Sequence, residues 1–406
     1  MKIWMWTAGA TLTIAAIPLL WPAGEAKSRL APYRFLLDAR PDGADDVAFL
    51  EARVARAPEG LDLAALARAY LRKARTTGQG RWIDQAEAAA HRSLEALPVS
   101  NPGATLALAQ AAQMRHEFAD SIASCDRVLR DRPRDPRALS LKATAQLGIG
   151  DVAGALRSAD ALVDRAPLSE HLALRAVVLA ASGNEREALH DFRKGAALEE
   201  PGDAEGSAWL RAMWARLALQ RGRTADAEDL LREALRIHPW CSPALGLLGD
   251  LELDRGRLDA ADGAFRDAFQ VSGDAVFLAR RAEVKKRQGD VSAAAELRDA
   301  AEKALRAAPG HRIALARLLL DRGSPEALLI AEEEATRRRN VETLEILARA
   351  RLAAGRPADA RLAVREAIRS GVLDARLHEL AAEIETRLGF ESRARMHLDA
   401  AREIRP

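Results

Sequence analysis

Glycine recurs along this chain at a nearly fixed interval, each time at the start of a short turn. These glycines stand at positions 150, 183, 222, 256, 289, 323, 355 and 389, with spacings of 33, 39, 34, 33, 34, 32 and 34 residues. Arg81 and His116 hold the corresponding places in two earlier units. A unit of this length cannot bury an apolar face alone, so stacked units must share a core. The period predicts an all-α solenoid of about ten helix-turn-helix units.

Two positions in each unit are occupied by small residues almost without exception. Seven residues before the turn marker stand Ala74, Ala109, Ala143, Ala176, Ala215, Gly249, Ala282, Ala316, Ala348 and Ala382. Five residues after it stand Ala86, Ser121, Ala155, Ala188, Ala227, Ala261, Ala294, Leu328, Ala360 and Ala394. Small side chains let two helices approach closely, so these positions predict the crossing of the two helices in each unit.

Two units depart from the pattern. The unit between Gly183 and Gly222 carries five extra residues, which predict a longer loop at residues 200–207. The unit that begins at Gly289 reaches its terminating proline late, at Pro309, so we expect its second helix to be longer.

Composition agrees with an all-helical chain and restricts its partners. Only 4% of the 406 residues are aromatic, and the 61 basic residues nearly balance the 59 acidic ones, for a net charge of +2. Such balance argues against a dedicated nucleic-acid-binding protein, which normally has a net basic surface. We therefore expect no nucleic-acid partner.

The N-terminus differs from the rest of the chain. Lys2 precedes an apolar run from Ile3 to Trp21, and Gly24 and Ala26 are suitable small residues for a cleavage site. Residues 1–26 are therefore predicted to be either a secretory signal peptide cleaved after Ala26 or an uncleaved membrane anchor. Residues 27–43 are predicted to be a linker, and residues 44–406 the solenoid. A periplasmic or secreted protein is expected, in contact with a membrane only through residues 3–22 if these are retained.

The repeat units resemble those of the tetratricopeptide repeat family. The resemblance rests on Pro243–Asp250, followed by Gly256–Ala261, and it extends over about residues 44–406. The stretch Leu66–Gly78 also resembles exported bacterial tetratricopeptide proteins of unassigned role. The resemblance implies a right-handed superhelix whose concave groove binds a peptide or a protein segment.

No motif for catalysis or for a cofactor is found. The eight histidines are scattered, and no phosphate-binding loop or nucleophile elbow occurs, so neither an enzyme, a cofactor nor a metal is predicted. His238 and Cys241 could supply two metal ligands, but the preferred interpretation is a loop whose Trp240 covers the junction between units. The acidic run 332–334 and the basic run 337–339 are interpreted as a solvated helix face with i, i+4 pairs; a phosphate-binding patch is the alternative.

The family register also predicts which residues line the groove. Positions thirteen, ten and six before each marker should face it, and eight of these residues are our candidates for partner binding. They are Gln110, Arg137, Thr144, Trp209, Arg216, Asp250, Arg317 and Arg349. For Trp209 two interpretations stand: an exposed anchor for a ligand, or packing against the inserted loop.

Two functions agree with these observations. The first is a non-enzymatic scaffold of the bacterial cell envelope that binds a partner protein or peptide in the groove. The second is a non-catalytic regulatory or substrate-presenting subunit of an envelope enzyme or assembly complex, such as one for polysaccharide export or cytochrome maturation. Self-association is compatible with either function, because no capping helix follows the last predicted unit.

Overall fold

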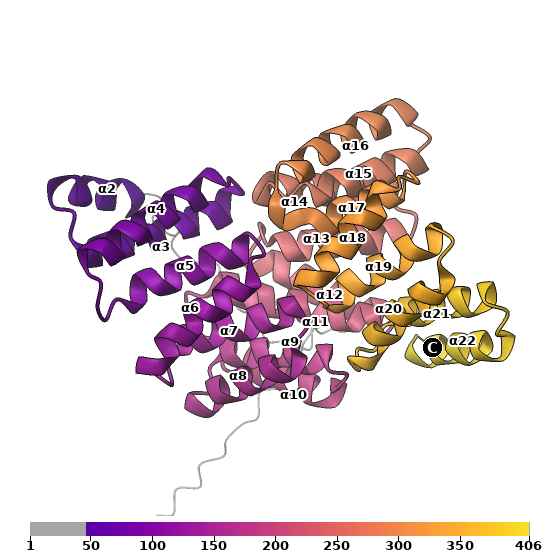
Figure 1. Ribbon diagram of the computed structural model, residues 1–406, viewed down its shortest axis with the longest axis horizontal. Helices are drawn as coiled ribbons and strands as arrows, with labels where there is room; N and C mark the ends of the chain where they lie inside the picture. Colours follow the sequence, from indigo (N-terminus) through magenta and orange to yellow (C-terminus); the bar gives the residue numbers. More distant parts are fainter. Residues whose placement is uncertain (1–45, 406) are drawn as a thin grey trace, which may run out of the picture. The chain divides into compact units, whose positions relative to one another are not determined.

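Helices account for all the regular structure in residues 46–405, the part of the chain that the computed structural model describes (Figure 1). The predicted leader, 1–26, and the predicted linker, 27–43, lie outside these residues. The helices are α2 (Asp46–Arg56), α3 (Gly60–Thr77), α4 (Arg81–Ala96), α5 (Pro102–Met114), α6 (Phe118–Asp131), α7 (Pro136–Ile149), α8 (Val152–Arg165), α9 (Ser169–Ala181), α10 (Glu185–Ala197), α11 (Ala204–Gln220), α12 (Thr224–Ile237), α13 (Ser242–Asp254), α14 (Leu258–Ser272), α15 (Val276–Arg287), α16 (Val291–Arg306), the 3-10 helix η1 (Pro309–His311), α17 (Arg312–Leu320), α18 (Glu326–Arg337), α19 (Val341–Ala353), α20 (Pro357–Arg369), α21 (Ala375–Arg387) and α22 (Glu391–Ile404).

After α2, the helices form ten units of two, from α3 and α4 in unit 1 to α21 and α22 in unit 10. We call the connection inside a unit its turn and the connection to the next unit its link. The two helices of each unit pack together, and each second helix also packs on the first helix of the next unit. The ten-unit solenoid predicted from the sequence is therefore confirmed.

The predicted crossing positions are buried. Ala143 and Ala155, one on each helix of unit 3, have no exposed surface. In unit 6, a Cβ added to Gly249 would lie 2.5 Å from the Phe265 ring. The exception is Leu328, which is only partly buried at the edge of the core of the later units. Small residues at these positions thus allow the close packing that the repeat requires.

The insertion in unit 4 is shared between a link and a helix. Helix α10 ends at Ala197, the link covers 198–203, and α11 already begins at Ala204. The prediction of a loop over the whole of 200–207 is therefore wrong for its second half. Asp203 explains the early start, because its side chain accepts a hydrogen bond from the Gly206 backbone N–H and caps the helix. The prediction of a longer second helix after Gly289 is confirmed by the 16 residues of α16.

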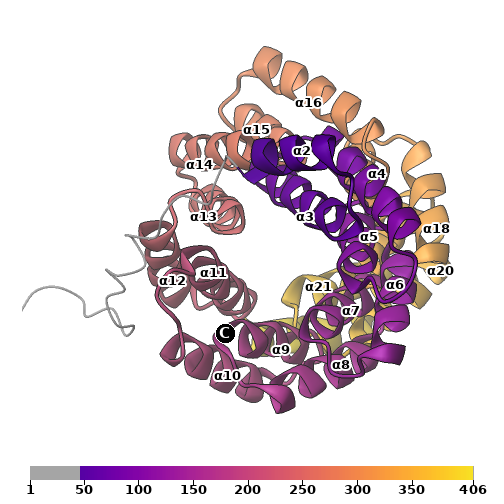
Figure 2. The ribbon, with the colours of Figure 1, turned by 90° about the vertical axis from the view of Figure 1, so that its left-hand side faces the viewer.

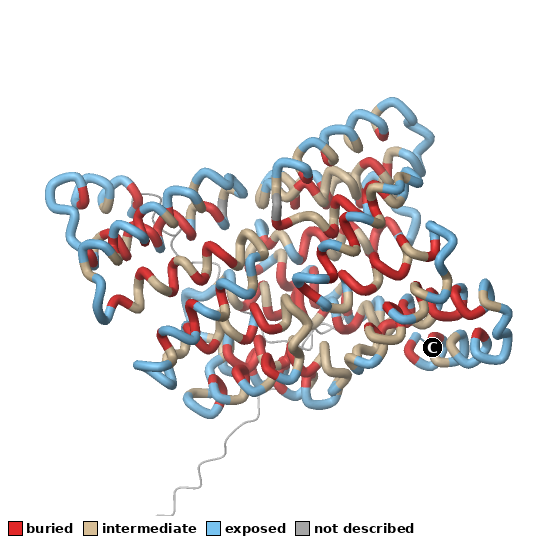
Figure 3. Tube along the Cα trace, viewed as in Figure 1, coloured by how far each residue is buried: buried red, intermediate tan, exposed pale blue. Residues whose placement is uncertain are grey.

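First and second helices form two layers. Consecutive first helices contact one another directly, as do α3 with α5, α5 with α7 and α9 with α11. Figure 2 shows the first helices on the inside of the curve and the second helices on the outside. Buried stretches run along the helices, whereas exposed stretches gather at their ends (Figure 3). We call the accessible side of the row of first helices the inner face.

The turns of units 1–5 also contact units far along the chain. Each of these five turns meets the connection that follows the unit five places later, and we call this row of contacts the seam. The contacts join Gly78 to Ser272 and Gly273, His116 to Gly310 and His311, Gly150 to Arg339 and Asn340, Gly183 to Gly371, and Gly222 to Arg405. The second half of the solenoid therefore packs on the first half, turn against link.

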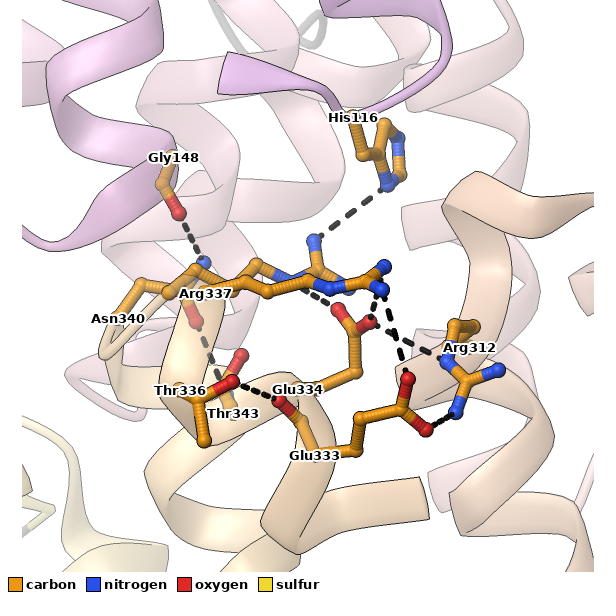
Figure 4. Close-up of polar contacts among 10 residues, drawn as sticks. His116, Gly148, Arg312, Glu333, Glu334, Thr336, Arg337, Asn340 and Thr343 are labelled. Carbon is orange, nitrogen blue, oxygen red and sulfur yellow. Dashed lines mark hydrogen bonds and ion pairs between the residues drawn. The ribbon is translucent and has the colours of Figure 1, made fainter. Parts of the chain in front are cut away.

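Hydrogen bonds hold the middle of the seam, and Figure 4 shows the one between Asn340 and Gly148. The Arg339 N–H donates to the carbonyl oxygen of Ile149 at 2.9 Å. The side-chain amide of Asn340 donates to the carbonyl oxygen of Gly148 at 2.8 Å, while its Oδ1 accepts from the Thr343 N–H and caps α19. One side chain thus starts a helix and joins two units that are 192 residues apart.

The charged runs 332–334 and 337–339 lie partly at this seam. Both predicted i, i+4 pairs are present: Glu333 with Arg337 at 3.4 Å and Glu334 with Arg338 at 3.0 Å. However, Glu334 is only 5% exposed and Arg338 only 7%, so the interpretation of a solvated face is wrong for this pair. The reason is tertiary, because Arg338 Nη1 lies 3.4 Å from Nδ1 of His116 in unit 2.

Candidate functional site

All eight candidate groove residues lie on first helices, and none of them is buried. Gln110 is partly buried on α5. The Thr144 side chain is exposed on α7, where its hydroxyl donates to the Ser140 carbonyl at 3.0 Å. The family register thus selects accessible residues of the inner row, although accessibility by itself does not test binding.

Three of the candidates have their charges neutralised by neighbours. The pairs are Asp250 with Arg280 at 2.9 Å, Arg317 with Glu342 at 3.4 Å, and Arg349 with Glu345 at 3.0 Å. Because each charge already has a partner, a ligand would have to replace an existing interaction to use it.

Arg137 and Arg216 are different, because neither makes an ion pair with any residue in the described part of the chain. Both side chains are exposed, yet the surrounding protein desolvates both guanidinium groups and lowers their pKa. The charge of Arg68 lowers the pKa of Arg137 further, whereas Glu342 partly opposes the shift at Arg216. Both side chains are therefore accessible on their first helices and lie close to other protein groups.

Interactions between distant first helices support this conclusion. Arg75 on α3 forms an ion pair with Glu205 on α11 at 3.0 Å, although the two residues are 130 positions apart. The pKa of Arg376 on α21 is raised mainly by Asp374, and further by the charges of Glu345 on α19 and Asp250 on α13. The first helices therefore present their charges to one another across the inner face.

Arg68 was not among the candidates, although the register used for prediction would have found it. It stands thirteen residues before Arg81, the position that selects Arg137 in unit 3. Arg68 is exposed on α3 and makes no ion pair with any described residue. Arg68, Arg137 and Arg216 together form a set of accessible, unpaired cations, which we call the inner arginines.

A buried ion cluster holds the helix that carries Arg216. The Arg211 guanidinium has no exposed surface and binds Glu199 of the preceding link, with Nη2 at 3.1 Å from Oε2. Its Nε lies 3.2 Å from Glu233 on α12. Such a cluster costs desolvation, but it fixes the orientation of its helix because Arg211 joins α11 to both the preceding link and α12.

The two tryptophans of α11 have different surroundings. Trp214 stacks on Phe192 of the preceding unit, with ring centroids 6.0 Å apart and planes within 5°. Trp209 is partly buried one and a half turns earlier on the same helix. Trp214 thus packs between two units, and the role of Trp209 in binding remains a prediction.

The segment 238–241 forms the link between α12 and α13, as predicted. Trp240 does not cover the junction, however, because 59% of its surface is exposed. Cys241 is buried instead, and burial raises the pKa of its thiol to about 11. Within residues 46–405 no three side chains of histidine, cysteine, aspartate or glutamate gather as metal ligands would. In the same range no helix combines the length and apolarity needed to cross a membrane.

Comparison with known proteins identifies the repeat. Two family models, both described as tetratricopeptide repeat, match residues 106–170 and 218–268. No curated protein matches the chain. Among solved structures, a human IFIT1 dimer with PPP-AAAA is similar, with 15% identity, a TM-score of 0.47, and coverage of 91% of this chain and 96% of that one. PilW, a type IV pilus biogenesis factor, is similar with 18% identity, a TM-score of 0.41, and coverage of 52% and 97%.

The matched segments cover most of unit 2, unit 3, the second helix of unit 5 and most of unit 6, and the same register continues through the other units. Tetratricopeptide repeats generally bind protein or peptide partners and serve as scaffolds rather than catalysts. On the two matches, the ten helix pairs and the shared register, the chain is a tetratricopeptide repeat protein.

Proposed function

We propose that this chain is a scaffold that binds an acidic segment of a partner protein on its inner face, through the inner arginines. The observation that carries the proposal is the contrast among the candidate residues: Asp250, Arg317 and Arg349 are neutralised in place, whereas Arg137 and Arg216 are not. A guanidinium group that is desolvated but unpaired gains free energy from a carboxylate.

The geometry favours an extended peptide. Arg68, Arg137 and Arg216 lie on α3, α7 and α11, two units apart in each case, so an occupant must span several first helices. Guanidinium groups bind carboxylates through two parallel hydrogen bonds, which suits acidic side chains along a strand of peptide. Trp209, on the same helix as Arg216, would supply an apolar contact beside the charges.

We further propose that this scaffold acts in the bacterial cell envelope, exported by the apolar N-terminal run. The support is the sequence Ile3–Trp21, with its small residues at 24 and 26. Sequencing the N-terminus of the protein purified from membranes and from the periplasm would distinguish a cleaved leader from a retained anchor; recovery only from the cytoplasm would contradict export.

The binding proposal can be tested with a fluorescein-labelled peptide of ten glutamates, using fluorescence anisotropy on the full chain. We expect binding that weakens about tenfold or more for each of Arg137→Gln and Arg216→Gln, since a hydrogen bond to a charged group is worth about 1.5–3 kcal/mol. A decaglutamine peptide should not bind.

The control is the double variant Arg186→Gln with Arg193→Gln, both exposed on α10, which removes two positive charges from the outer layer where each test variant removes one. This variant should bind the peptide nearly as well as the natural chain. Equal weakening in both sets of variants would show a nonspecific charge effect and contradict the assignment of the inner arginines. Capture of partners from envelope extracts with the same variants then identifies the natural ligand.

A further inference from the structure

The seam leaves two matching edges of the solenoid without a partner. In the seam, the turns of units 1–5 lie against the connections after units 6–10. The turns of units 6–10 and the links of units 1–5 therefore take no part in the seam. The five glycines of the later turns all have open space where a Cβ would be: Gly256, Gly289, Gly323, Gly355 and Gly389. We call the later turns the turn edge and the earlier links the link edge.

The link edge carries exposed apolar side chains that the covered links lack. Four of the five free links hold one: Val99 at 72% exposure, Leu168 at 43%, Leu198 at 43% and Trp240 at 59%. No large apolar residue in the covered links, 273–275, 307–311, 338–340 and 370–374, is exposed to this degree. Apolar residues that recur along one edge mark an interaction surface.

From these observations we propose that a second copy of this chain binds head to tail, its turn edge seated on the link edge of the first copy. The contact repeats the seam, in which the turn of one unit meets the link that follows the unit five places later. The units are numbered onward from unit 10 of one copy into unit 1 of the next copy. The turn of unit 8 in one copy therefore meets the link after unit 3 in the next. Gly323 of one copy then lies near Leu168 of the other, and Gly389 and Phe390 lie near Trp240.

The ends of the solenoid agree with this arrangement. Met396 and Leu398 on α22 are 58% and 40% exposed at the C-terminal end, and Phe49 on α2 is 64% exposed at the N-terminal end. In a continuing superhelix, α22 of one copy would cover α2 of the next. Because the two edges of the interface are different surfaces, the contact is heterologous and can extend into an open chain of copies.

The test is to crosslink two variants of the full chain that each gain one accessible cysteine, Leu168→Cys and Ser324→Cys, with a short bismaleimide in mild detergent. Ser324 follows Gly323 at the turn edge. We expect a covalent dimer when the two variants are mixed and none from either alone. The native Cys125 and Cys241 interfere little, because burial raises the pKa of their thiols to about 12 and about 11.

A dimer from one variant alone would show a two-fold symmetric contact and overturn the head-to-tail arrangement. Sedimentation provides an independent test: the double variant Leu168→Asp with Trp240→Asp should weaken association at least tenfold. The matched control, Leu329→Asp with Leu362→Asp, alters residues that are 68% and 59% exposed on second helices and should leave association unchanged. A natural chain that stays monomeric at high concentration, with its own N-terminal segment covering the link edge, would refute the proposal.

Discussion

The turns of units 3–5 and those of units 6–10 have the same marker glycine but different surroundings. Gly183 and Gly355, for example, both hold a left-handed backbone, with φ of 81° and 72°. A Cβ on Gly183 would lie 2.2 Å from the carbonyl oxygen of Gly371, whereas one on Gly355 would meet nothing within 4 Å. In these two turns glycine is favoured at Gly355 for its conformation and at Gly183 for both conformation and space.

This difference bears on how the array is stabilised. In an open solenoid each unit contacts only its neighbours, so stability is close to a sum of local terms. Here the seam joins unit 2 to the connection after unit 7, and unit 3 to the connection after unit 8. We infer that disturbing one seam contact destabilises units in both halves of the chain.

The largest effect is expected from Gly183→Ala. Alanine in the left-handed region costs about 1–2 kcal/mol, and overlap with the Gly371 backbone adds about 1–3 kcal/mol. We therefore expect a loss of roughly 3–4 kcal/mol in urea unfolding. Gly355→Ala is the control, with a loss of only about 1 kcal/mol. Equal losses at the two positions would mean that the seam is not formed in solution.

The next effect is the pH dependence of the seam at His116. Burial lowers the pKa of His116 from 6.5 to about 4, helped by the charges of His311 and Arg338 and opposed by Asp274. Because the folded protein binds this proton less readily than the unfolded chain does, acid favours unfolding. Stability that is complete above pH 6.5 should fall by up to about 3 kcal/mol as the pH approaches 4.

Unfolding of the natural chain and of His116→Asn, compared at pH 7 and pH 4.5, would measure this contribution. Asparagine tolerates the left-handed backbone that His116 adopts, with φ of 60°, and does not titrate in this range. The variant should therefore lose less stability on acidification. If both chains lose the same amount, His116 is solvated rather than packed at the seam.

A smaller effect is expected at Asn340, which caps α19 and also bonds to unit 3. Asn340→Ala removes both interactions and should cost about 2 kcal/mol. Asp290→Ala removes only the cap of α16, at a turn outside the seam, and should cost about 1 kcal/mol. Asn340→Asp keeps the cap but not the amide donor, so chemical denaturation should place it between the natural chain and Asn340→Ala.

The smallest expected effect distinguishes the conformational cost of replacing a turn glycine from the steric cost. Asparagine adopts the left-handed region more readily than alanine does, so Gly355→Asn should cost less than about 1 kcal/mol. At Gly183 the same substitution keeps the overlap with Gly371 and should remain strongly destabilising. If Gly183→Asn recovers stability to the level of Gly355→Asn, only the backbone conformation matters there.

Much of the fold could be predicted because each unit is local. Ala143 and Ala155 are small, regularly spaced and buried, as the period requires. The inner face followed from the same register, which selects Arg137 and Arg216 and would also have selected Arg68. Their lack of ion-pair partners could not be predicted, because Arg317 and Arg349 occupy the same kind of position and are paired with acids.

The sequence by itself determined the unit, its two helices, their crossing and the number of copies, because helix periodicity, turn glycines and small residues act over short distances. The tertiary structure alone decided which turns are covered. Arg338 and Asn340 have nothing in their local sequence that predicts contact with units 2 and 3. That contact depends on the rotation and translation between successive units. Summed over five units, these small steps bring distant turns and links together.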